Sequence, residues 1–208
     1  MVRTFIGGLV AGLVIFVVGF IFKMTPLAEL AYSNAEPARG AAVQTSLAQN
    51  LTESGTGTYI VPGYKTAEEA VLYGKGPIAT VHFNTQGASR NDMSAILPGF
   101  IVALITGTLI AFGLRAVAGP GIGFAGLARL VVLFSSGITI WTILAQPIFN
   151  HYGWGYWIYS FIAETAGLIA GGLIVAKWFL PRDHLPHAAA APREEAPHVG
   201  EAPPVTEA

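Results

Sequence analysis

Glu164 is the residue whose type and position could do chemistry, because it is the one carboxylate inside a membrane-length apolar segment. Between His151 and Lys177 the chain carries no other formally charged residue. A helix beginning at Trp154 would place Glu164 roughly 15 Å along its axis, near the middle of a hydrocarbon core about 30 Å thick. A carboxylate at that depth costs on the order of 2–3 kcal/mol, so it needs a partner, a proton or a water-filled cavity.

Three interpretations of Glu164 are open. As a protonated or hydrogen-bonded carboxyl it would tie helices together; as an ionisable group it would handle protons or cations; or it would contact a separate subunit. Hydroxyls expected at a similar depth complete a candidate intramembrane polar site: Thr106, Thr139 and Thr142. The apolar segments hold no Lys, Arg or His as a counter-charge, which favours a neutral Glu164 if the helices exclude water.

Small residues predict where the helices touch. Ser160, Gly167 and Gly171 share the helix face of Glu164 and direct it toward a neighbouring helix. Gly8 and Gly12 form a GxxxG pair in the first apolar segment. The second segment has a small residue at every fourth position: Gly99, Ala103, Gly107 and Ala111. Such a stripe allows close approach of membrane helices, so we expect it to be the main helix-packing surface.

The composition indicates an integral membrane protein. Mean hydropathy is +0.57 and only 11% of residues are charged, which excludes an ordinary soluble domain. A net charge of −1 with scattered basic residues leaves no footprint for nucleic acid. The lack of cysteine excludes thiolate chemistry. Four apolar segments predict membrane-spanning helices: Thr4–Phe22, Met93–Leu114, Leu130–Phe149 and Trp154–Trp178.

The predicted fold is a membrane all-α protein: a four-transmembrane-helix bundle with a small α+β extracytoplasmic insert between helices 1 and 2. Residues 1–23 form the first transmembrane helix and 24–92 the insert. Residues 93–180 form a three-helix transmembrane region, and 181–208 a disordered cytoplasmic tail rich in Pro and Ala. A cleaved signal peptide is less favoured than a retained first helix, because no convincing cleavage site follows it.

The insert pattern alternates helix and strand signals. A helix is predicted over Ala38–Leu51, and strands over Thr58–Val61 and Ile78–Asn84. Thr66 and Glu69 have capping-box spacing at the start of a short helix that Gly74 should end. Isolated hairpins are marginal, so we expect the insert to lean on the membrane helices or on a partner.

Basic residues beside the short connections predict the orientation. Arg3, Arg115, Arg129, Lys177 and Arg182 would lie on the cytoplasmic side, and only Lys23 argues the other way. Both chain ends are therefore expected in the cytoplasm, with the insert and the aromatic loop before the last helix on the far side. The layout favours the bacterial inner (cell) membrane.

Recognisable catalytic and cofactor motifs are missing. Gly121, Gly123 and Gly126 match GxGxxG, but membrane spans flank them and no acidic residue follows at the required distance. His82 and His151 are expected at solvated or headgroup positions, so neither a metal nor another cofactor is predicted. The leading hypothesis is a non-enzymatic accessory, assembly or homo-oligomeric membrane subunit, with the lipid bilayer and a membrane-protein partner or itself as partners. The alternative is a small oligomeric transporter or channel with Glu164 in a proton or cation path.

Overall fold

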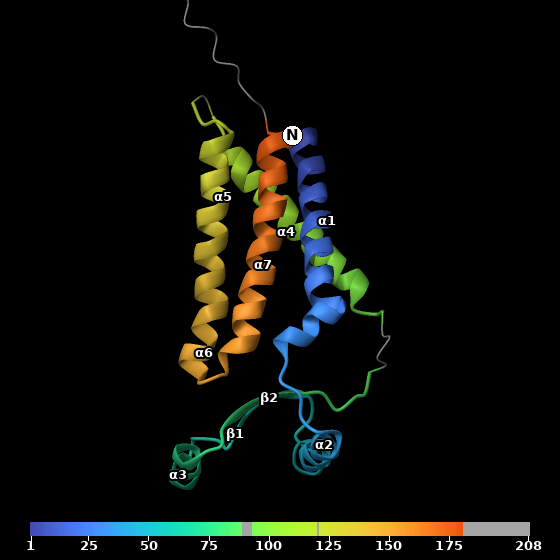
Figure 1. The fold of residues 1–208 in the computed structure, drawn as a ribbon, viewed down its shortest axis with the longest axis vertical. Coiled ribbons are helices and arrows are strands. Elements are labelled where there is room, and N and C mark those ends of the chain that lie inside the picture. The colour runs from blue at the N-terminus through green and yellow to red at the C-terminus, as the bar shows by residue number, and fades with distance from the viewer. Residues whose placement is uncertain (89–92, 120, 181–208) are drawn as a thin grey trace, which may run out of the picture.

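The computed structural model describes residues 1–88, 93–119 and 121–180; the predicted disordered tail lies outside these ranges. The chain is mostly helical with one two-stranded sheet (Figure 1). Four helical segments are long and apolar enough to cross a membrane, which makes this a multi-pass membrane protein. They are α1 (Val2–Met24), α4 (Ile96–Val117), Phe124–Asn150 and Trp154–Phe179.

The last two segments each contain a π-helical turn. The third consists of α5 (Phe124–Thr139), the π-turn η2 (Ile140–Leu144) and α6 (Ala145–Asn150). The fourth consists of α7 (Trp154–Ile174) and the π-turn η3 (Val175–Phe179). Pro147 follows η2, and its ring would clash with the carbonyl of residue 143 in a regular helix, so the widened turn has a local cause.

Two arginines lie inside helices rather than at their boundaries. The second helix extends past Arg115 to Val117, and the third begins at Phe124, before Arg129. The predicted limits of Leu114 and Leu130 were therefore too narrow. A long basic side chain near a helix end can carry its charge to the interface, so the charge does not stop the helix.

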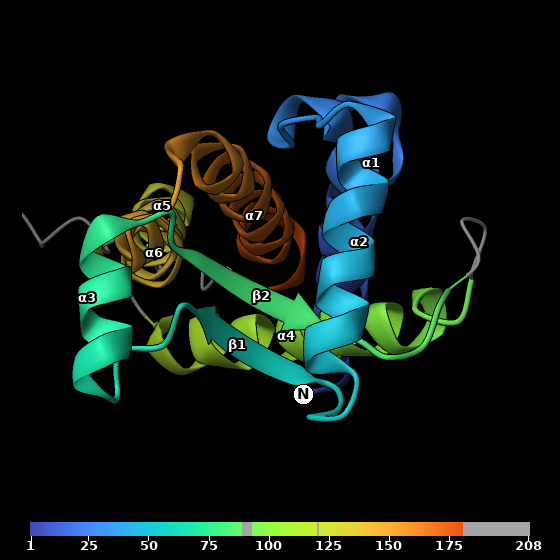
Figure 2. The ribbon, with the colours of Figure 1, turned by 90° about the horizontal axis from the view of Figure 1, so that it is seen from below.

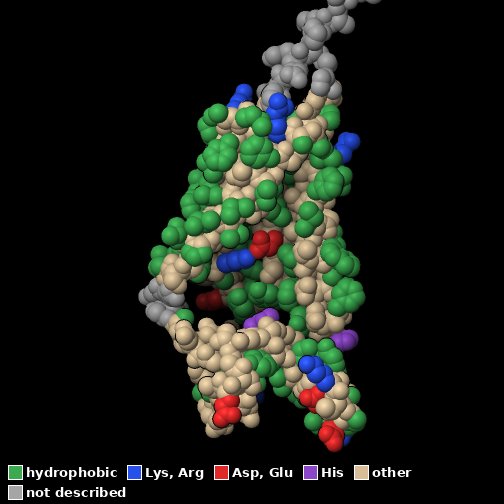
Figure 3. All heavy atoms as spheres, turned by 180° about the vertical axis from the view of Figure 1, so that it is seen from behind, with side chains coloured by type: hydrophobic (Ala, Val, Ile, Leu, Met, Phe, Trp, Pro, Cys, Tyr) green, Lys and Arg blue, Asp and Glu red, His purple; other side chains and the backbone are tan. Residues whose placement is uncertain are grey.

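The helices α1 and α7 run antiparallel at the centre of the molecule, with α4 packed across α1 and α5 packed along α7 (Figure 1). The start of α1 and the end of α7 lie at one end of the helices, and the insert lies at the other. Basic side chains gather at the first of these ends (Figure 3). We call it the basic end, and the opposite one the insert end.

Tight packing is confined mainly to the basic end. The buried residues of α1 all lie between Thr4 and Gly12, and none of its described residues from 13 to 24 is buried. In α7 the first buried residue is Ala163. The core cluster joins all four spanning segments: Ala11, Ala111, Leu114, Leu127, Val131, Val175, Ala176 and Leu180. The helices therefore converge at the basic end and diverge toward the insert (Figure 1).

The insert follows the predicted order of helices and strands. It comprises the 3₁₀ helix η1 (Pro26–Ala31), α2 (Pro37–Leu51), β1 (Gly57–Val61), α3 (Ala67–Lys75) and β2 (Ala79–Phe83). The strands pair antiparallel, with Tyr59 opposite Val81. The capping box of Thr66 and Glu69 is present. However, α3 ends at Gly76, whose φ of 64° favours glycine, and Gly74 is an interior helix residue.

The insert has no core of its own. Of the residues from Thr25 to Ala88, all of them described, only Ala31 is buried. Both α2 and α3 lie across the direction of the spanning helices, as the view along the bundle shows (Figure 2). Val43 on α2 is 58% exposed and Val71 on α3 is 57% exposed.

Candidate functional site

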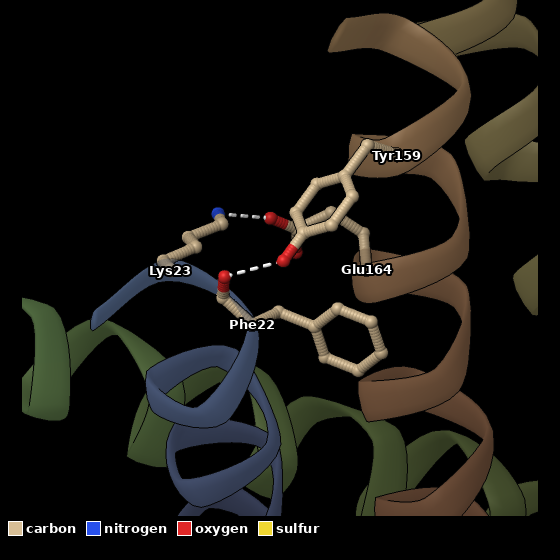
Figure 4. A network of polar contacts seen from close by, with 4 residues as sticks. All are labelled: Phe22, Lys23, Tyr159 and Glu164. Carbon is tan, nitrogen blue, oxygen red and sulfur yellow. Dashed lines mark hydrogen bonds and ion pairs between the residues drawn. The ribbon is translucent and has the colours of Figure 1, made fainter. Parts of the chain in front are cut away.

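Glu164 on α7 forms an ion pair with Lys23 in the last turn of α1 (Figure 4). The side chains are 41% and 56% exposed, respectively. The expectation that Glu164 lacks a counter-charge was therefore wrong. Lys23 directly follows the first predicted apolar segment, and its side chain reaches the carboxylate.

The depth at which α1 ends explains this contact. The hydroxyl of Tyr159 donates a hydrogen bond of 2.6 Å to the carbonyl of Phe22, so the end of α1 lies beside Tyr159. Tyr159 is five residues beyond Trp154, so α1 ends roughly 7 Å deeper than α7 begins. Lys23 thus lies alongside α7 rather than beyond its start, and Glu164 is within reach of its side chain.

The last turn of α1 has side-chain partners for its carbonyls. The Tyr159 hydroxyl donates to the carbonyl of Phe22, and the Thr25 hydroxyl donates to the carbonyl of Ile21 at 2.6 Å. Terminal carbonyls of a helix have no partner within the helix and are costly to leave bare in an apolar setting. Lys23 also adds a positive charge at the negative end of the helix dipole. The site therefore anchors the end of α1 to α7.

The face of α7 that was predicted to carry Glu164 together with Gly167 and Gly171 contacts α1. A Cβ added at Gly171 would lie 3.1 Å from the Ala11 carbonyl, and one at Gly167 would lie 3.7 Å from the Ile15 carbonyl. At the basic end, Arg3 donates a hydrogen bond of 2.6 Å to the carbonyl of Trp178. The α1–α7 contact thus begins at a basic residue and ends at the ion pair.

The predicted hydroxyl residues do not join Glu164. Thr139 is 3% exposed, and its hydroxyl lies 2.7 Å from that of Thr165, which links α5 to α7. The hydroxyls of Thr106 and Thr142 donate to the carbonyls of their own helices, four residues earlier. Within the described residues, none of these three threonines forms a hydrogen bond to the Glu164 carboxylate.

The small-residue stripe of α4 meets the GxxxG pair of α1. Gly107 lies directly against Gly8 and Gly12, and a Cβ added at Gly8 would lie 2.6 Å from the Thr108 Cα. Ala103 and Ala111 are buried as well. Gly99 differs, because it is exposed and an added Cβ there would meet nothing within 4 Å. The stripe is therefore used inside this chain, over the part of α4 that crosses α1.

A groove leads from the insert end to the ion pair. Its deeper part, of about 120 Å³, lies between α1, η1 and α7 and is lined by nine residues: Phe22, Lys23, Ala28, Ala31, Tyr32, Tyr156, Tyr159, Ser160 and Ala163. Its outer part, of about 430 Å³, shares Ala31, Tyr32 and Tyr156 with the deeper part and extends to Ser33, Gly153 and Gly155. This groove was not predicted from the sequence, although the tyrosines of the aromatic loop and of the start of the last helix were a signal for it.

The two histidines outside the tail lie at separate places. His82 on β2 is exposed, and its Nδ1 lies 3.1 Å from the Thr58 hydroxyl on β1. His151 ends α6 with a φ of 55° and lines a small hollow between the insert and the loop before α7. Among the described residues, no three His, Cys, Asp or Glu side chains are grouped to hold a metal ion.

Comparison with protein-family models, with curated proteins and with solved structures finds no match for this chain. Its function is therefore inferred from its own residues.

Proposed function

We propose that this protein is a non-enzymatic integral membrane subunit that acts by association, either as an accessory or assembly subunit of another membrane protein or as a homo-oligomer. The observation that carries the proposal is the insert without a core, in which only Ala31 is buried between Thr25 and Ala88. A two-stranded hairpin is marginal by itself in water. An ordered insert of this kind is expected to gain its stability from a covering partner.

The helix α2 is the surface best suited to that contact. Val43, Leu47 and Leu51 recur every fourth residue and so form one apolar stripe. None of the three is buried, and α2 as a whole has no buried residue. This stripe lies outside the four membrane-length helices. The small residues of α4, by contrast, are already in contact with α1.

A photo-crosslinking amino acid at Val43 in the full chain, expressed in its own host, tests the proposal. We expect one discrete adduct whose mass identifies either a second copy or one partner protein. The matched control is the same amino acid at Thr45, which lies about 200° further round the helix. No adduct at Val43, or an equal yield of adducts at both positions, would exclude association through this face.

The proposed location is the bacterial inner (cell) membrane with both chain ends in the cytoplasm. Its support is the basic end, where Arg3, Arg115, Arg129 and Lys177 belong to the ends of the spanning segments. The insert then lies on the extracytoplasmic side. Lys23, the one basic residue that opposed this orientation, is engaged by Glu164.

A small oligomeric transporter or channel is the alternative, supported by the partial exposure of Glu164. Proton or cation flux into liposomes that contain the full chain would test it, with Glu164→Gln as the variant. Flux that the wild type shows and the variant lacks would favour this alternative. The internal hydrogen bonds of Thr106 and Thr142 make it the weaker candidate.

A further inference from the structure

We propose that the groove between η1 and α7 binds the zwitterionic headgroup of a phospholipid, of the aminoalkyl phosphate class, from the surrounding bilayer. The first argument is the exposure of the ion pair. Lys23 and Glu164 keep 56% and 41% of their side-chain surface uncovered, although Glu164 lies ten residues inside a membrane-length helix. Exposed charge at that depth is unfavourable, so a polar group that covers the pair would be stabilising.

The charges of the pair match such a headgroup. A zwitterion brings one anion and one cation; Lys23 lines the groove, and the carboxylate of its ion-pair partner Glu164 lies directly behind it. The ion pair and the zwitterionic headgroup are each neutral overall, so binding leaves the net charge of the site unchanged. A purely anionic headgroup would satisfy Lys23 and place a like charge close to Glu164. The site thus discriminates by charge pattern rather than by total charge.

The walls of the groove supply further contacts. Tyr32 and Tyr156 face each other with ring centroids 5.5 Å apart, and Phe22 packs on Tyr159 at 5.7 Å. Aromatic faces attract a desolvated ammonium group. Within the described part of the chain, the hydroxyls of Tyr156 and Ser160 make no hydrogen bond. These two hydroxyls are therefore available to a phosphate.

The position of the groove favours a lipid over a soluble molecule. It opens beside Gly153 and Gly155, next to the stacked rings of Tyr152 and Trp157, and aromatic residues of this kind mark the headgroup level. Apart from Lys23, the exposed side chains in the second half of α1 are apolar, among them Val17, Phe20 and Ile21. Acyl chains can follow that surface while the headgroup enters the groove.

Native mass spectrometry of the delipidated full-length chain, after addition of phosphatidylethanolamine, tests this proposal. We expect retention of this lipid to exceed that of phosphatidylglycerol by about fivefold, which corresponds to roughly 1 kcal/mol. Soluble phosphoethanolamine, which has the same headgroup but no acyl chains, should bind more weakly than phosphatidylethanolamine. Equal retention of both lipids would indicate a simple anion site and would overturn the proposal.

Two groove-filling variants separate binding from folding. Ser160→Leu and Ala28→Leu each fill the groove from a different wall and leave the ion pair in place, so the lipid preference should disappear. Ile162→Leu, at an exposed position of α7, is the matched control and should keep it. A preference that survives in both filled variants with unchanged melting temperature would overturn the proposal. So would a crosslinked second protein occupying the groove of the wild type.

Discussion

Lys23 and Glu164 form an ion pair although 141 positions separate them in the chain. The pair joins the last turn of α1 to α7 at the level where the buried part of α7 begins, next to Ala163. It therefore marks the boundary between the packed half of the molecule and the open half.

Removing one member of this ion pair should lower the free energy of unfolding more than removing both members. Lys23→Gln leaves a carboxylate without a partner among apolar helices, and we expect a loss of about 1–2 kcal/mol in the free energy of unfolding. The double variant Lys23→Gln with Glu164→Gln removes both charges and should recover part of that loss. Unfolding in lipid-like detergent measures the coupling, and additive single effects would contradict a direct pair.

Contact between α1 and α4 should depend on Gly107. Gly107→Ala places a methyl group against the backbone of Gly8 and Gly12, and overpacking of this kind costs about 1–3 kcal/mol. Gly113→Ala on the same helix is the matched control, because an added Cβ there meets nothing within 4 Å. Thermal unfolding of the purified variants compares the two, and equal melting temperatures would refute the contact.

The α1–α4 contact also has a direct reporter, because the chain has no native cysteine. Phe16 and Phe100 lie edge to face across the two helices, with ring centroids 5.2 Å apart. Cysteines at both positions should react with a short bismaleimide to give a crosslink within one chain. Gly107→Ala should reduce the crosslink yield, whereas Gly113→Ala should not.

The hydroxyl pair of Thr139 and Thr165 should stabilise the α5–α7 contact. Thr139→Val keeps the shape and removes the hydroxyl, and hydrogen bonds between membrane helices are worth about 0.6–1.7 kcal/mol. Thr142→Val is the control, because its hydroxyl serves its own helix and the side chain is exposed. Unfolding free energies in detergent measure both changes. If Thr142→Val lost more unfolding free energy than Thr139→Val, the result would contradict the proposed role of Thr139.

Two glycines at the end of α3 should respond in opposite directions. Gly76→Ala forces a side chain onto a φ of 64°, which costs about 1 kcal/mol. Gly74→Ala lies inside the helix with nothing within 4 Å, so it should stabilise α3 by about 0.5–1 kcal/mol. Amide hydrogen exchange across α3 reports both effects. If both variants changed the stability of α3 in the same direction, the result would contradict Gly76 as the residue that ends the helix.

The two ends of the molecule should label from opposite sides of the membrane. A cysteine at Gln49 in the insert should react with a membrane-impermeant maleimide added to intact spheroplasts. A cysteine at Gly119, in the connection at the basic end, should react only after the membrane is opened. The reverse pattern would invert the proposed orientation.

Local patterns predicted the elements well. The spacing of apolar residues located all four spanning segments, and Thr66 with Glu69 marked a real helix start. The helix limits were less accurate, because Arg115 and Arg129 were read as boundaries. Each of these features depends on a few neighbouring residues, which is why the sequence reveals it.

The tertiary relationships were harder to predict. The pairing of Lys23 depends on how far α1 penetrates beside α7, and no local pattern encodes the relative depth of two helices. Gly99 has the same four-residue spacing as Gly107, but the tilt of α4 carries it away from α1 (Figure 1). Residue type and spacing therefore identified the candidates, and the crossing geometry decided which of them are in contact.

The concentration of buried side chains at the basic end has a dynamic consequence. Helices held together at one end and separated at the other should fluctuate unequally along their length. Spin labels placed on α4 and α5 near the insert should give a broad distribution of distances, and labels near Leu114 and Leu127 a narrow one. Thinner bilayers, which compress the splayed half more than the packed half, should change only the first distribution.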